Sequence, residues 1–156
     1  VKAHIIRPYA AFRVAAHYGC HALRPSEITG FDDPVAPVLF DDLVATTGAE
    51  SMDWPEKLAC CGGPVYPVNE TLSMTLAGKK LAAAGRAEAH AITTACPFCQ
   101  LQFERFRRDD TGLGALENGV LSIVYPQLLG FAMGLDPDML GIKAGHRQVL
   151  ERFSGT

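Results

Sequence analysis

Five cysteines are the residues of this sequence best suited to chemistry. They form three groups: Cys20, the adjacent pair Cys60 and Cys61, and the C-x-x-C motif of Cys96 and Cys99. An odd number of cysteines does not make a closed disulfide framework. A chain of 156 residues buries roughly 70% of the surface its unfolded form exposes, so it folds without disulfides or metal. We therefore expect thiols in a reducing compartment, the cytoplasm, where they bind metal or act in catalysis.

The C-x-x-C motif is predicted to lie at a turn between a strand and a helix. Cys96 takes the N-cap, and Pro97 takes the first helical position, where its missing N–H is harmless. Cys99 then lies in the first turn, close to unpaired backbone N–H groups and the positive end of the helix dipole. We expect this setting to favour the thiolate form of Cys99, which is the form that binds metal.

The Cys60–Gly63 segment is the more specific signal. Adjacent side chains of an extended backbone point to opposite sides, whereas Gly62 and Gly63 allow a sharp bend and close approach to a bulky group. Zinc sites use four ligands, and a four-iron cluster normally takes one thiolate per iron, so five thiols exceed both sets. Two other interpretations stay open: a zinc-binding structural or docking module on four of the cysteines, and a dithiol–disulfide oxidoreductase using Cys96 and Cys99.

The elements that must position these thiols alternate along the chain. Strands are predicted at residues 12–18, 50–54, 89–95 and 121–125, and helices at 39–47, 69–84, 97 onward, 127–134 and 145–153. This alternation predicts an α/β fold with a mainly parallel sheet flanked by helices. Each cysteine group follows one of the first three strands, so the cysteines are expected to converge at the carboxyl edge of the strands. In the helix at 69–84, Leu72, Leu76 and Leu81 are expected to lie near one face, with Asn69 as N-cap.

Several polar residues near the cysteines are further candidates. His17 and His21 bracket Cys20, and either could donate a hydrogen bond to a sulfur of a bound cluster. Arg24 and Lys57 could offset negative charge at such a site or hold an acidic group of a substrate.

Composition restricts the partners. With 14 basic and 17 acidic residues, the chain lacks the basic stripe expected of a nucleic-acid-binding protein. No apolar run reaches the length of a membrane span, and from residues 1–12 we expect no secretory signal. The sequence also has no G-x-G-x-x-G dinucleotide motif, so we expect electrons to come from a partner subunit.

The cysteine spacing resembles that of the cysteine-rich CCG domain. The pattern is Cys20-x39-Cys60-Cys61-Gly62-x33-Cys96-x2-Cys99, and the segments 17–21, 23–25, 31–34 and 126–130 are most similar to the B subunit of heterodisulfide reductase. The resemblance extends over residues 14–143. Subunits of this kind carry two such domains, so residues 1–156 are expected to form a single CCG domain, the C-terminal one of a longer subunit.

The resemblance implies a cofactor, a reaction and partners. All five cysteines would ligate one noncubane 4Fe-4S cluster, with one or more thiolates bridging, and Gly62 and Gly63 would support the cluster loop. The methanogen enzyme cleaves the disulfide between coenzyme M and coenzyme B at two facing clusters. This chain would thus serve in disulfide reduction or electron relay, within a complex whose other subunits carry iron–sulfur clusters and flavin.

Overall fold

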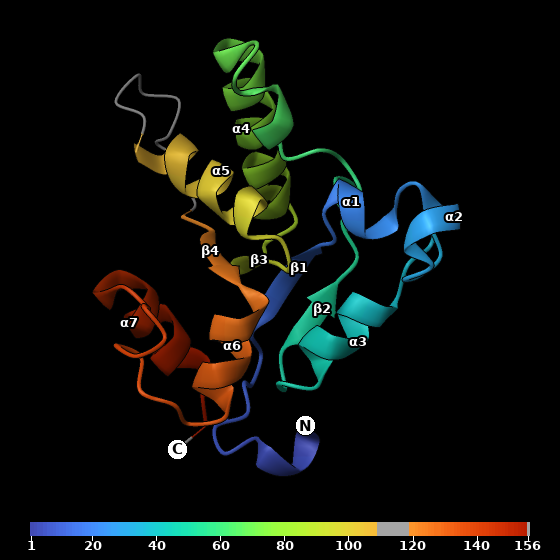
Figure 1. The fold of residues 1–156 in the computed structure, drawn as a ribbon. Coiled ribbons are helices and arrows are strands. Elements are labelled where there is room, and N and C mark those ends of the chain that lie inside the picture. Colours follow the sequence, from blue (N-terminus) through green and yellow to red (C-terminus); the bar gives the residue numbers. More distant parts are fainter. Residues whose placement is uncertain (109–118, 156) are drawn as a thin grey trace.

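Four parallel strands form the central sheet of the computed structural model, which describes residues 1–108 and 119–155 (Figure 1). The strands are β1 (Arg13–His17), β2 (Glu50–Met52), β3 (Ala91–Thr94) and β4 (Leu121–Val124), in the spatial order β2-β1-β3-β4. Ala15 of β1 pairs with Met52 on one side and with Ile92 on the other. The α/β fold with a parallel sheet, predicted from the sequence, is confirmed.

Helices cover both faces of this sheet (Figure 1). On one face, Ala15 and Ile92 pack against α4 (Glu70–Arg86) and α5 (Pro97–Arg108). On the other face, Val14 and Ile123 share a core with α3 (Leu39–Ala45), α6 (Tyr125–Ala132) and α7 (Ala144–Phe153). Alternate residues of β1 and β3 therefore belong to different cores, as the two-residue period of a strand requires.

Two short helices lie between β1 and α3. They are α1 (Cys20–Leu23) and α2 (Ser26–Thr29), and two 3-10 turns lie at Lys2–His4 and Gly63–Val65. Single-turn helices of four residues carry too little periodicity to be recognised in a sequence. They matter because α1 begins at the first cysteine.

Helix α4 contains both a confirmed and a wrong prediction. The side chain of Asn69 accepts a hydrogen bond from the Leu72 backbone N–H at 2.9 Å, which confirms the N-cap. Leu72, however, is 46% exposed whereas Leu81 is fully buried, so these leucines do not share one face. The buried stripe of the helix is built largely from small residues such as Ala77. Small side chains permit close packing on α5: a Cβ added at Gly78 would lie 2.7 Å from the Phe106 ring.

Across residues 1–108 and 119–155, no helix combines the length and the apolar character that crossing a membrane would require.

Candidate metal centre

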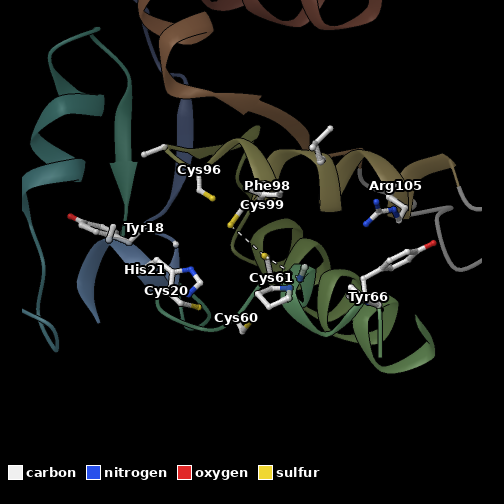
Figure 2. Close-up of a pocket in the computed structure, with 17 residues that line it drawn as sticks. Tyr18, Cys20, His21, Cys60, Cys61, Tyr66, Cys96, Phe98, Cys99 and Arg105 are labelled. Carbon is white, nitrogen blue, oxygen red and sulfur yellow. Dashed lines mark hydrogen bonds between the residues drawn. The ribbon is translucent and has the colours of Figure 1, made fainter. Parts of the chain in front are cut away.

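All five cysteines line one cavity of about 510 Å³ (Figure 2). Cys20 begins α1 three residues after β1 ends, Cys60 and Cys61 lie in the connection from β2 to α4, and Cys96 and Cys99 flank the start of α5. All five are free thiols. The structure thus brings together three groups of cysteines that are up to 79 positions apart in the sequence.

Cys61 and Cys99 form the buried inner end of this set. Their sulfur atoms are 3.3 Å apart and joined by a hydrogen bond, drawn as a dashed line in Figure 2. The backbone N–H of Gly63 also donates to the Cys61 sulfur, at 3.4 Å. The hydrogen bond with Cys99 lowers the pKa of Cys61 to about 4, and the same bond raises the pKa of Cys99.

The prediction that Cys99 would be the thiolate was therefore wrong for the metal-free protein. Cys99 does lie in the first turn of α5, as expected. Two sulfur atoms in contact cannot both be charged at little cost, and their hydrogen bond lowers the pKa of Cys61 while it raises the pKa of Cys99.

The other three thiols lie nearer the mouth of the cavity and are partly exposed. The Cys60 sulfur accepts a hydrogen bond from the backbone N–H of Gly62 at 3.3 Å. Burial raises the pKa of Cys20, and the neighbouring Cys60 sulfur adds to the shift. Negative charges gathered at these sulfurs repel one another, so a cation that binds several of them at once would be strongly favoured.

The loop that carries Cys60 and Cys61 is tied to two helices. Gly62 has φ of +85°, and a Cβ placed there would lie 2.4 Å from the Ser73 carbonyl oxygen. The Ser73 hydroxyl donates to the Gly62 carbonyl at 2.8 Å and accepts from the Gln102 amide at 2.9 Å. Ser73 belongs to α4 and Gln102 to α5, so both helices hold the loop in place.

His17 lies behind the inner thiols and is 1% exposed. Neither of its ring nitrogens makes a hydrogen bond of normal geometry with the described residues. Burial lowers the pKa of His17, and Cys61 and the Lys57 backbone lie near enough to oppose that shift. One of its nitrogens and the sulfurs of Cys61 and Cys99 all lie within 4.8 Å of one another. The ring packs edge-on against Phe103, with centroids 5.6 Å apart. A buried imidazole without such hydrogen bonds is costly, and it points to a group bound at this site.

The other candidate site residues from the sequence lie at the rim of the cavity or outside its lining. His21 lines the cavity at its exposed rim. Lys57 forms a 2.7 Å salt bridge with Asp41. Arg24 is exposed and does not line the cavity. The prediction that these two cations offset charge at the thiols receives no support from their positions.

One buried cation was not predicted. Lys80, on the buried side of α4, is 1% exposed. The sequence holds a faint signal for it, because Lys80 lies three residues after Ala77 and next to Leu81, which are both in the core. Sequence reasoning gave it no role, because lysine side chains are usually solvated.

These features together suit a metal group held by sulfur. Thiolates select zinc, copper(I) and iron–sulfur clusters. The site offers five free thiols around one cavity, one of which readily ionises, and an imidazole that makes no hydrogen bond of normal geometry with the described residues. The residues present therefore fit an iron–sulfur cluster.

Comparison with known proteins agrees with this chemistry. The B subunit of the ferredoxin/F420H2-dependent CoB-CoM heterodisulfide reductase of Methanosarcina acetivorans is 40% identical over 141 residues, which is 89% of this chain and 47% of that protein. The B subunit of the ferredoxin:CoB-CoM heterodisulfide reductase of Methanosarcina mazei is 39% identical over 141 residues, with the same shares. The membrane anchor subunit of 8-methylmenaquinol:fumarate reductase of Wolinella succinogenes is 32% identical over 143 residues, 91% of this chain and 50% of that subunit.

The chain thus spans about half the length of these relatives, all of which are named as subunits of oxidoreductases. The family model for the cysteine-rich domain CCG matches residues 14–104, a range that contains all five cysteines. The chain belongs to the cysteine-rich CCG domain family.

Proposed function

We propose that this chain holds one noncubane 4Fe-4S cluster on its five cysteines and works as an electron-handling domain of an oxidoreductase similar to the B subunit of heterodisulfide reductase. One observation carries the proposal: five free thiols line a single cavity. When bound, the cluster would supply one-electron steps and iron sites that attract sulfur. The ligands would be Cys20, Cys60, Cys61, Cys96 and Cys99.

The residues around the thiols would have supporting roles. Gly62 and Gly63 place their backbone N–H groups against the sulfurs of Cys60 and Cys61, and N–H···S bonds tune the potential of iron–sulfur sites. His17 would donate a hydrogen bond to the bound group, which would give its buried ring a partner. His21, at the exposed rim, is placed to meet a substrate entering the cavity.

Disulfide reduction would need partners outside this chain. Cleaving one disulfide takes up two electrons and two protons and yields two thiols. The electrons would come from subunits carrying iron–sulfur clusters or flavin, as proposed from the family resemblance. Because the chain spans about half of its relatives' length, we propose that residues 1–156 form one CCG domain of a longer, cytoplasmic subunit.

A mononuclear zinc site is the second candidate. It is favoured by the cluster of His17, Cys61 and Cys99, whose ligand atoms all lie within 4.8 Å of one another. Zinc takes four ligands of this type in structural sites, so one further cysteine would complete the set. Such a centre would leave two cysteines unused and would make the chain a docking module.

Single cysteine variants separate these functions. Each cysteine is replaced by alanine in protein purified without oxygen, and iron and sulfide are measured per chain. The five-cysteine cluster predicts that every variant loses iron, whereas Phe98→Ala, which alters an exposed residue lining the same cavity, retains it. Zinc retained in full in two of the five variants, with neither iron nor sulfide in any of the proteins, would support the zinc site. Disulfide reduction by metal-free protein would instead indicate a dithiol oxidoreductase.

A further inference from the structure

Lys80 carries a buried positive charge on the side of the sheet that holds the metal centre. Its side chain is 1% exposed and lies in the middle of α4. Its ammonium group lies over the ring of Trp54, which belongs to the same buried cluster as Cys61 and Cys99. Charged lysines are almost never fully buried unless they are paired, so this position needs a physical explanation.

The contacts that the structure gives Lys80 do not neutralise it. Its Nζ donates a hydrogen bond to the backbone carbonyl of Glu56 and lies 4.8 Å from the centre of the Trp54 ring. The carboxylate of Glu56 pairs instead with Lys79, at 3.3 Å. In the described part of the chain, Lys80 therefore has a carbonyl and a ring as partners but no ion pair.

The negative groups that act on Lys80 include the cysteine sulfurs. Burial lowers the pKa of Lys80 to about 8. The charge of Glu56 opposes that shift most, and the charges of Cys61, Cys20 and Cys99 add to the opposition. Lys80 in turn acts on Cys20, where its charge opposes the rise in pKa that burial causes. Interactions between buried charges are screened little by solvent, so they persist over longer distances than at a surface.

We propose that Lys80 is the buried counter-ion of the metal centre, a positioning residue whose fixed charge raises the reduction potential of the group held by the cysteines. The inference rests on the proposed function. A cluster held by five thiolates is anionic, and each added electron makes it more so. A positive charge held in the adjacent core favours that electron, while the Glu56 carbonyl and the Trp54 ring keep the ammonium in place.

The test is a redox titration of the anaerobically purified protein and four variants. Lys80→Gln and Lys80→Met remove the charge, and the glutamine still offers a donor to the Glu56 carbonyl. Lys80→Arg keeps the charge. Lys79→Gln is the matched control, because it removes the same charge from the adjacent, exposed lysine.

We expect both uncharged variants at position 80 to lower the ratio of reduced to oxidised cluster at the wild-type midpoint potential. The expected change is about tenfold, which is about 59 mV for a one-electron couple. Lys80→Arg and Lys79→Gln should retain the wild-type midpoint. A variant lacking the charge that folds by circular dichroism but assembles no cluster, while Lys80→Arg assembles one, would also support the proposal.

Other outcomes would overturn it. If Lys80→Gln or Lys80→Met binds a cluster with the wild-type midpoint, Lys80 serves only to tie the Glu56 carbonyl to α4. If Lys80→Arg loses the cluster along with the uncharged variants, side-chain shape and not charge is required. Wild-type protein without iron or sulfide would refute the proposed function itself, and the inference with it.

Discussion

Replacing Gly62 by alanine is expected to destabilise the metal-free protein by about 2–5 kcal/mol. Two terms contribute. The backbone at Gly62 has φ of +85°, where a residue with a Cβ costs roughly 1–2 kcal/mol more than glycine. The new Cβ would also lie 2.4 Å from the Ser73 carbonyl oxygen and 3.1 Å from the Cβ of Leu76, and overpacking of this kind costs roughly 1–3 kcal/mol.

Gly30 provides the control. It also has a positive φ, of +52°, but no atom lies within 4 Å of a Cβ built there. Gly30→Ala should therefore show only the backbone cost, about 1 kcal/mol after the lower entropy of the unfolded chain is included. Urea unfolding followed by circular dichroism, in reducing buffer, gives both free energies of unfolding. If the two variants differ by less than about 0.5 kcal/mol, the steric argument for Gly62 is wrong.

Three other changes test separate parts of the account. Ser73→Ala removes two buried hydrogen bonds that hold the cysteine loop and should cost about 1–3 kcal/mol of unfolding free energy, while Thr75→Ala on the exposed side of α4 should cost less than about 0.5 kcal/mol. Lys80 has a pKa of about 8 in the fold against roughly 10.4 when unfolded, so the unfolded chain binds more protons between these values. The penalty of burying the charge is full below pH 8 and is relieved as pH rises. The free energy of unfolding of the wild-type protein should therefore rise by up to about 3 kcal/mol relative to Lys80→Met by pH 10. Urea unfolding of the metal-free proteins at each pH measures this, and a constant difference would contradict it. Cys99→Ala removes the hydrogen bond that lowers the pKa of Cys61, so the ultraviolet thiolate absorbance that wild-type protein keeps below neutral pH should move to higher pH, and an unchanged titration would show that Cys99 does not set it.

The fold and the gathering of the cysteines could be predicted from the order of elements. Parallel strands present their carboxyl ends at one edge, so residues that follow successive strands meet there whatever their separation in sequence. Cys20 follows β1, Cys61 follows β2 and Cys96 follows β3, and all three line the same cavity. Element order alone was enough to predict this, without side-chain detail.

The state of individual groups could not be predicted in the same way. Which of Cys61 and Cys99 keeps the proton depends on a 3.3 Å contact between residues 38 positions apart. The burial of Lys80 depends on the side of α4 that faces α5 and the sheet, and small residues rather than leucines mark that side. Helical periodicity counts apolar residues and is insensitive to such close packing.

Iron, acid-labile sulfide and zinc content of the wild-type protein, purified without oxygen, tests the central claim most directly. A cluster on five cysteines predicts close to four irons and four sulfides per chain, with a paramagnetic resonance signal after mild oxidation. One zinc per chain without sulfide would contradict the claim and leave the chain as a structural metal-binding module.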